Sequence, residues 1–203
     1  MSKKKKTYSG VAVFLTLMLL LGLTVWQSKD RLERRWLYPW PFEETVFYYA
    51  GKNNIDPYLV ASVINNESRF RATAKSERGA VGLMQLMPDT ASWVAKEMGL
   101  GPLASEALLD PDTNIRLGCW YLSELLHEFG GNEVLALAAY NAGRGTVHQW
   151  MWENEWDASF CATRLIPYNE TRVYVEKVLS DKRKYNDLYW LADGSDKRKN
   201  KKG

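Results

Sequence analysis

The strongest constraint on this fold is a helix-start signal that occurs twice, at Asp56-Pro57 and at Asp110-Pro111. Aspartate before a helix accepts hydrogen bonds from the unpaired N–H groups of the first turn, and proline fits the first helical position. The second signal precedes a long helical pattern that stops at Gly130-Gly131, a typical C-terminal boundary. The two signals therefore predict a helical domain with short loops.

The remaining boundaries support the same fold class. We predict further helices at 88–98, at 133–140 after a capping Asn132, and from a capping Asn169 onwards. Strand-like alternation is scarce, and only a small irregular hairpin is expected around 72–81. The sequence predicts a mainly α domain.

An uncharged apolar run lies near the N-terminus, at residues 11–26. With the residues before it, the run approaches the ~20 residues that a bilayer core requires. A cleaved signal peptide has a shorter apolar region, ~7–15 residues, that ends in a small-x-small site. The run ends instead in Thr24-Val25-Trp26-Gln27. We predict an uncleaved transmembrane helix at 9–27.

Lysines at 3–6 precede this segment, but four basic residues also follow it within 29–35. The positive-inside rule therefore favours a cytoplasmic N-terminus only modestly. The expected topology is a single-pass protein of a bacterial cell membrane whose main domain lies outside the cytoplasm, at the cell surface or in the periplasm. The predicted organisation is a basic cytoplasmic N-terminus at 1–8, the anchor at 9–27, a juxtamembrane linker at 28–42, the helical domain at 43–190 and a basic disordered tail at 191–203.

Composition narrows the partners. Hydrophobic residues make up 46% of the 203 residues, enough to form a core, and the net charge of +3 argues against nucleic acid as the main partner. An oxidising compartment would permit a bridge between Cys119 and Cys161. Cys119 lies in a helical pattern, however, where a small buried hydrophobe is the usual role. His127 and His148 stand apart from other ligand-type residues, so no metal site is predicted.

Glu67 occupies a core-like position in the helix after Pro57. It follows Leu59 and Val63 at spacings of four residues, which places all three on one helix face. By spacing alone, an exposed acid at a helix end is the better interpretation. A partly desolvated acid would instead have a raised pKa and could donate a proton near neutral pH.

Two downstream runs favour the second interpretation. Residues 79–82 contain two glycines that permit close backbone approach, and Gln85 can both donate and accept hydrogen bonds. Tyr140-Asn141 places polar groups at the tip of an apolar helix. These groups are suited to surround an acid in a cleft.

Taken together, these runs resemble the transglycosylase SLT domain, the catalytic module of lytic transglycosylases in the lysozyme-like α+β superfamily. The resemblance covers roughly 45–178 and rests on ordered motifs: Glu67-Ser68-Arg69-Phe70, Gly79 through Gln85 to Pro88, Asn114 to Gly118, Ala138 to Gly143, and Ile166-Pro167 with Glu170 to Val175. Departures from the family pattern occur at Arg71-Ala72, at Cys119 and at Arg144, where proline is common.

The resemblance implies that Glu67 is the catalytic acid and then the base, acting on the bond between N-acetylmuramic acid and N-acetylglucosamine in peptidoglycan strands, as in murein turnover. It further implies a cleft lined by Ser76, Gln85, Tyr140 and Asn141, with Met87 as its floor, Tyr174 close to Glu67, and Ser68 and Glu170 in supporting positions. It implies no metal and no cofactor.

The family mechanism needs one acid only. Glu67 protonates the glycosidic oxygen, the substrate's acetamido group stabilises the cation, and Glu67 then takes the proton of the muramoyl C6 hydroxyl as a 1,6-anhydro ring closes. Glu77, Asp89 and Glu170 are of the right type for the second carboxylate of a hydrolase, but no motif requires it of them.

Two alternatives remain open at this level. One is a goose-type lysozyme-like hydrolase that cleaves the same bond with water. The other is a membrane-anchored scaffold that binds peptidoglycan, cleaves it poorly and serves a cell-wall synthesis, division or secretion assembly. For Trp150, Trp152 and Trp156 we favour core packing over stacking on sugars.

Overall fold

The computed structural model describes the backbone of residues 4–190 and the side chains of 10–25 and 28–189. The chain divides into two compact units at the Pro39–Trp40 bond, and each is described by itself. The predicted basic tail at 191–203 and the first three residues lie outside the described part.

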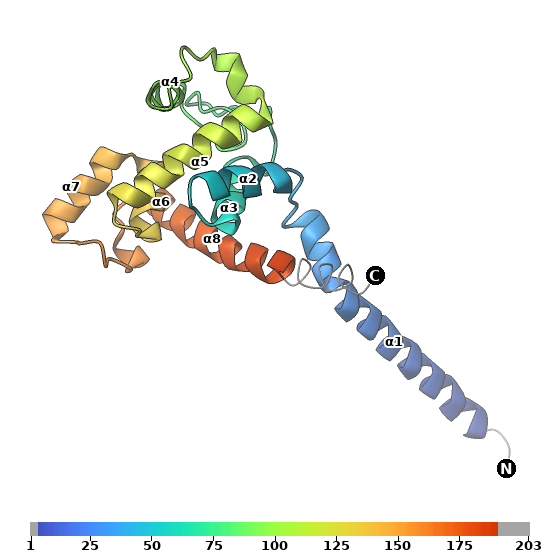
Figure 1. The fold of residues 1–203 in the computed structure, drawn as a ribbon. Coiled ribbons are helices and arrows are strands. Elements are labelled where there is room, and N and C mark those ends of the chain that lie inside the picture. Colours follow the sequence, from blue (N-terminus) through green and yellow to red (C-terminus); the bar gives the residue numbers. More distant parts are fainter. Residues whose placement is uncertain (1–3, 191–203) are drawn as a thin grey trace, which may run out of the picture. The chain divides into compact units, whose positions relative to one another are not determined.

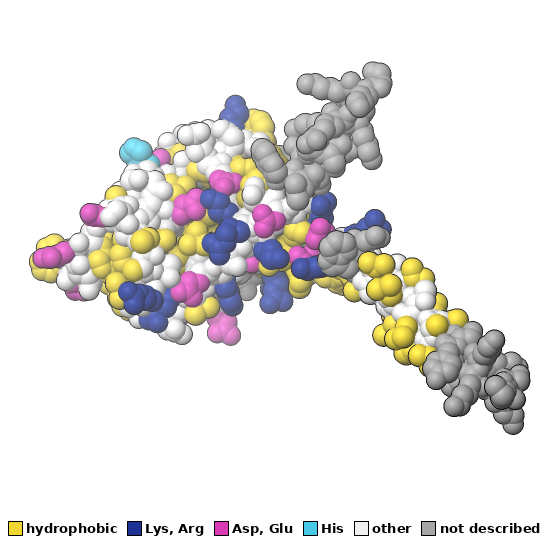
Figure 2. Space-filling view, turned by 90° about the horizontal axis from the view of Figure 1, so that it is seen from below, with side chains coloured by type: hydrophobic (Ala, Val, Ile, Leu, Met, Phe, Trp, Pro, Cys, Tyr) yellow, Lys and Arg dark blue, Asp and Glu magenta, His cyan; other side chains and the backbone are white. Residues whose placement is uncertain are grey.

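The N-terminal unit is built on one helix, α1 (Lys4–Trp36). Every side chain from Gly10 to Val25 is exposed, and apolar groups dominate that stretch on the face seen in Figure 2. Among the described residues, no single helix meets the length and hydropathy expected of a membrane span. A bent pair, 10–25 and 28–36, meets them together, with 47° between its two segments. The predicted span at 9–27 is therefore not confirmed.

The second unit contains the predicted helices in the predicted order (Figure 1). Its elements are α2 (Glu43–Lys52), α3 (Pro57–Ser68), α4 (Pro88–Glu97), η1 (Ser105–Leu109), α5 (Pro111–Glu128), α6 (Glu133–Ala142), α7 (Arg144–Asn154), η2 (Thr163–Leu165), α8 (Asn169–Tyr185) and η3 (Asn186–Trp190).

The predicted caps form as hydrogen bonds at three helices. Asp56 accepts from the Tyr58 N–H at 2.8 Å, and Asp110 accepts from the Thr113 N–H at 2.9 Å. Asn132 accepts from the Leu135 N–H at 3.0 Å. The capping role predicted for Asn169 is wrong: Tyr168 holds the cap position without a side-chain bond, and Asn169 is already the first helical residue.

Helix α3 lies in the core of this unit, packed against α2 and α8, and α5 packs against α2, α4 and α6 (Figure 1). The apolar stripe of α3, Leu59, Val60, Val63 and Ile64, is fully buried, as its spacing predicts. Burial of such a side chain stabilises the fold by about 1.5–3 kcal/mol. The stripe therefore holds α3 against the helices around it.

The segment between α3 and α4 has little regular structure. Two isolated antiparallel bridges, Lys75↔Val81 and Val81↔Leu86, give it a hairpin-like form, close to the irregular hairpin predicted at 72–81.

The predicted core role of the tryptophans is confirmed for Trp150, which is buried, and is wrong for Trp152, which is 83% exposed. Trp156 is half-buried and stacks on Phe160 at a ring-centroid distance of 3.8 Å. Cys119 is buried and Cys161 is exposed, and neither is bridged. Cys119 is therefore the buried hydrophobe that its helical position predicts.

Candidate active site

Glu67 lies in the last turn of α3, at the C-terminal end of its buried stripe. The helix ends because Arg69 and Phe70 adopt left-handed backbone conformations, with φ of 52° and 57°. Phe70 is buried, and its ring centroid lies 6.4 Å from that of Tyr185. The chain reversal thus leaves Glu67 half-buried at the edge of the core rather than on a frayed, solvated helix end.

Desolvation raises the pKa of Glu67 from its ordinary 4.5 to about 7, and the Tyr174 hydroxyl partly offsets this by lowering it. Within the described part of the chain, no charged side chain contributes to the shift. A nearby cation would stabilise the carboxylate and a second carboxylate would oppose it. Glu67 is thus a lone acid that is partly protonated at neutral pH.

Two tyrosines face this acid from different helices. Burial, and then the Glu67 charge, raises the pKa of both Tyr140 and Tyr174 well above the usual value, so both keep their protons. Tyr140 in α6 donates its hydroxyl to the Met84 carbonyl at 2.7 Å. The Tyr174 hydroxyl in α8 is buried next to Glu67 without a well-formed hydrogen bond. The structure therefore brings both predicted tyrosines to the acid.

Asn114 at the start of α5 fixes the turn that contains Met84. Its Oδ1 accepts from the Met84 N–H at 2.8 Å, and its Nδ2 donates to the carbonyls of Val81 and Leu108 at 3.0 and 2.9 Å. Asn114 is fully buried, so each of these bonds replaces one that water would otherwise make. The turn is thereby tied to the core.

Glycine is required at two points of this contact. Gly82 has φ of +82°, and a Cβ there would lie 2.2 Å from Asn114 Nδ2 and 2.3 Å from the Leu108 carbonyl oxygen. A Cβ on Gly118 would lie 2.2 Å from the sulfur of Met84. Both glycines let the turn and α5 approach closely, which explains why the two motifs occur together.

Two predicted amide side chains are held by hydrogen bonds. Gln85, at φ of 47°, donates Nε2 to the Gly82 and Ala74 carbonyls at 2.9 and 3.2 Å. Asn141 accepts from the Thr171 hydroxyl at 2.8 Å. Their orientations are thus set by the turn and by α8.

The remaining predicted residues are less closely tied to the acid. Ser68 is buried and donates to the Ile64 carbonyl, while Ser76 is exposed and caps its own turn by accepting from the Ala80 N–H. Met87 is 42% exposed at the start of α4. Glu170 is exposed and makes no hydrogen bond or ion pair to the described residues. The cleft roles of Ser76, Met87 and Glu170 stay predictions.

Sequence reasoning assigned no role to Asn114, Thr171 or Tyr121. All three lie in or beside the motifs on which the resemblance rests, but each contacts a residue far away in sequence: Asn114 contacts Met84, Thr171 contacts Asn141, and Tyr121 contacts Tyr140. Only the fold brings these partners together. Within residues 10–25 and 28–189, no group of three His, Cys, Asp or Glu side chains could hold a metal ion.

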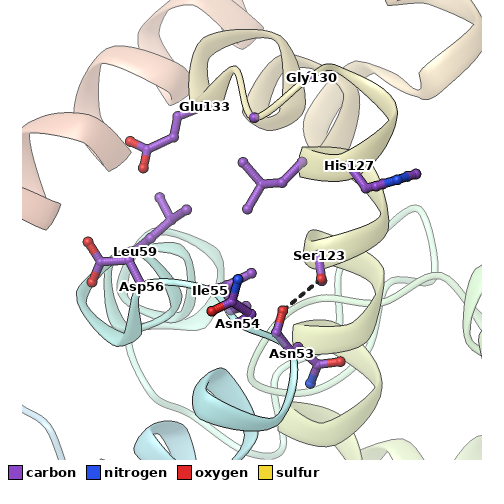
Figure 3. Close-up of a pocket in the computed structure, with 11 residues that line it drawn as sticks. Asn53, Asn54, Ile55, Asp56, Leu59, Ser123, His127, Gly130 and Glu133 are labelled. Carbon is purple, nitrogen blue, oxygen red and sulfur yellow. Dashed lines mark hydrogen bonds between the residues drawn. The ribbon is translucent and has the colours of Figure 1, made fainter.

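A pocket of about 500 Å³ lies at the opposite end of α3 and contains none of the predicted site residues (Figure 3). Asp56 and Leu59 line one side and Ser123 and His127 the other, and the Ser123 hydroxyl donates to the Asn53 carbonyl at 2.9 Å. This pocket is therefore not where the perturbed acid lies.

A lone desolvated acid flanked by two tyrosine hydroxyls forms a candidate general acid–base site on a lysozyme-like helical fold. The family model described as the transglycosylase SLT domain matches residues 44–160. The chain belongs to this family.

The relatives agree with that assignment. The soluble lytic murein transglycosylase of Escherichia coli (strain K12) is 35% identical over 166 residues, which are 81% of this chain and 25% of the relative. The match to the crystal structure of the 70-kDa soluble lytic transglycosylase from Escherichia coli covers 81% of this chain and 26% of that protein's chain. The two are 34% identical, with a TM-score of 0.71. The match to the X-ray structure of an inactive mutant of the lytic transglycosylase Slt from Pseudomonas aeruginosa covers 77% of this chain and 25% of that protein's chain. The two are 36% identical, with a TM-score of 0.68.

A shorter similarity links the chain to a membrane-bound lytic murein transglycosylase F from Desulfosudis oleivorans, at 38% identity over 48% of this chain and 21% of the relative. The chain spans about a quarter of the length of the soluble lytic transglycosylases named above.

Proposed function

We propose that the domain is a peptidoglycan lytic transglycosylase that cleaves the β-1,4 bond between N-acetylmuramic acid and N-acetylglucosamine. The observation that carries this proposal is the lone acid: Glu67 has a pKa of about 7 through desolvation, without help from a charged neighbour. An acid with a pKa near the working pH can donate a proton and then accept one.

The reaction then runs in two stages on one carboxyl group. Glu67 gives its proton to the glycosidic oxygen as the bond to C1 of the muramoyl unit breaks, and the acetamido oxygen of the same sugar stabilises C1. The C6 hydroxyl then attacks C1, and its proton passes to the Glu67 carboxylate, which restores the acid. The intramolecular attack gains from proximity and consumes no water.

The buried surroundings of Glu67 support this reaction over one that uses two carboxylates. A second carboxylate at ~5–9.5 Å, as hydrolases of that type require, should raise the pKa of Glu67 further. No carboxylate of the described residues contributes to its pKa. Goose-type hydrolysis by one acid and water is the alternative.

Mass spectrometry of the products separates the two reactions. Purified sacculi are digested with the protein, and the new chain ends are weighed. A transglycosylase produces anhydro ends, lighter by one water than the reducing ends that hydrolysis produces. Reducing ends alone would overturn the proposed reaction, and no soluble product would favour the peptidoglycan-binding scaffold.

For the N-terminal unit we propose a membrane anchor at residues 9–27 that holds the domain on the outer face of the bacterial membrane, with reach limited to nearby wall. The uncharged, exposed apolar run at 11–25 supports this proposal. Carbonate-washed membranes should retain the full-length protein with its original N-terminus. Release by carbonate, or an N-terminus beginning after the apolar run, would refute an uncleaved anchor.

A further inference from the structure

Aromatic side chains from α4 and α5 continue the site away from Glu67. Tyr121 lies beside Tyr140, with ring centroids 5.4 Å apart. Trp93 then contacts Tyr121 and Trp120, at 6.2 and 5.5 Å. A series of ring contacts therefore leads from Tyr140, whose pKa the Glu67 charge raises, to Trp93.

This aromatic cluster, Trp93, Trp120 and Tyr121, is not a closed core. Trp93 is 36% exposed, and Trp120 and Tyr121 are half-buried. Rings that pack on one another and still present area to solvent offer a rigid apolar surface with little entropy to lose on binding. The C–H face of a pyranose ring fits such a surface.

Arg144, the first residue of α7, adds a positive charge to this cluster. Its guanidinium carbon lies 5.4 Å from the centre of the Trp93 ring, and its Nε lies 2.7 Å from Glu128 Oε2. The side chain is 44% exposed, and its two terminal amino groups make no hydrogen bond within the described part of the chain. They form a fork suited to a carboxylate.

Glu128 and His148 hold the Arg144 side chain in position. Glu128 is mostly buried, and its second oxygen lies 2.6 Å from His148 Nε2. The ring of His148 in turn lies against Phe129, 5.0 Å away. Arg144 is thus clamped between an indole and a carboxylate while its outer edge stays open. It is also the residue that stands where the family commonly has proline.

We propose that Trp93, Trp120 and Tyr121 bind a sugar ring of the glycan strand beyond the bond that is cut, and that Arg144 binds a carboxylate carried by the same strand. The inference rests on the proposed function, because it takes the Glu67 site to hold a peptidoglycan strand. Such a carboxylate has two sources: the stem peptide, or the lactyl group of muramic acid once the peptide is removed.

The test is steady-state kinetics and equilibrium binding with the full chain on three strand preparations: peptide-bearing strands, amidase-treated strands with free lactyl carboxylates, and strands whose carboxylates are converted to amides. Arg144→Gln should raise KM and Kd roughly tenfold on the carboxylated strand that the site recognises, the scale of one lost charge-assisted hydrogen-bonded pair. It should leave kcat unchanged and have little effect on amidated strands. The carboxylated preparation on which the change appears identifies the source.

Arg183→Gln is the matched control, because Arg183 is an exposed arginine in the last turn of α8. It should change none of these values. Trp93→Ala should weaken binding of all three preparations, and its thermal unfolding, recorded in parallel, reports whether the aromatic cluster still folds.

The double variant Arg144→Gln/Glu128→Gln tests a purely structural role for Arg144. If Arg144 only neutralises Glu128, removing both charges should restore wild-type KM and Kd, and this would overturn the inference. Equal losses on carboxylated and amidated strands, or no loss on any strand, would overturn it too. Failure of the proposed function gives a different result: the wild-type protein then forms no anhydro ends. In that case the effect of Arg144→Gln on Kd still tests whether Arg144 binds a carboxylate of the strand.

Discussion

The two ends of α3 each carry one acid, and the acids differ in how their charge is balanced. Asp56 at the N-terminal end accepts from the Tyr58 N–H, and its Oδ2 lies 3.0 Å from Lys182 Nζ. For Glu67 at the C-terminal end, no cation among the described residues offsets desolvation, and its pKa rises to about 7. One helix thus presents an acid whose charge is balanced by a lysine and an acid whose pKa is raised by desolvation.

The pocket and the acid with the raised pKa lie at different ends of α3. The pocket of about 500 Å³ adjoins the compensated acid (Figure 3), whereas the perturbed acid lies at the other end of the helix. A hollow offers room, but only a group whose protonation state is poised near neutral pH can exchange protons with a substrate. The absence of charge compensation is what makes the Glu67 end the candidate for the proposed catalysis.

The largest expected difference between the two ends is in catalysis. Glu67→Gln should lower the rate of muropeptide release from sacculi by at least about 10²–10⁴-fold, the range for a general acid–base group, because the amide can neither give nor take the proton. The matched variant Asp56→Asn should keep nearly wild-type activity. Cleavage by Glu67→Gln, or an equal loss in Asp56→Asn, would break the distinction.

The second difference is in stability against pH. The pKa of Glu67 is about 7 in the folded state against an ordinary 4.5. The folded state therefore binds more protons, and stability decreases as the pH rises from about 4.5 to above 7, by about 3 kcal/mol in all. Glu67→Gln lacks this titration, so chemical denaturation should find it more stable than wild type at pH 8 and equal to it near pH 4. A wild type as stable as the variant at pH 8 would show that Glu67 is solvated.

At the other end, the cation is the group to remove. Lys182→Met deprives both Asp56 and Glu133 of their partner. Because these carboxylates are about one-third exposed, the pairs are screened and the loss of unfolding free energy should be about 1 kcal/mol. Urea unfolding measures the loss, and activity should be unchanged. A marked loss of activity in a folded variant would mean that the two ends are coupled.

The smallest expected effect is on the pKa of Glu67, which the Tyr174 hydroxyl lowers. Activity should decrease as the pH rises past about 7, because the acid must be protonated. Tyr174 lowers the pKa of Glu67, so Tyr174→Phe should move this alkaline limb to higher pH. A pH–rate profile of kcat/KM records the shift. An unmoved or lowered limb would contradict the role of the hydroxyl.

Local signals predict α3 well because they act between residues close in sequence. Asp56 caps the first turn through a neighbour two residues away, and the spacing of Leu59, Val63 and Glu67 places them on one face whatever the rest of the chain does. The same reasoning fails at Asn169 and Trp152. Helix α8 begins one residue earlier than the cap signal implies, and Trp152 is exposed because α7 buries Trp150 instead.

By itself the sequence determined the order of the helices, the core-like position of Glu67 and the motifs that match the SLT family, because each depends on residues a few positions apart. Only the tertiary structure decided that Glu67 is desolvated without a charged partner among the described residues, that Tyr140 and Tyr174 face it, and that Asn114 holds the turn at Met84. These features depend on contacts between helices far apart along the chain. Whether an acid keeps its proton is decided by the groups that exclude water from it, and folding alone brings those groups together.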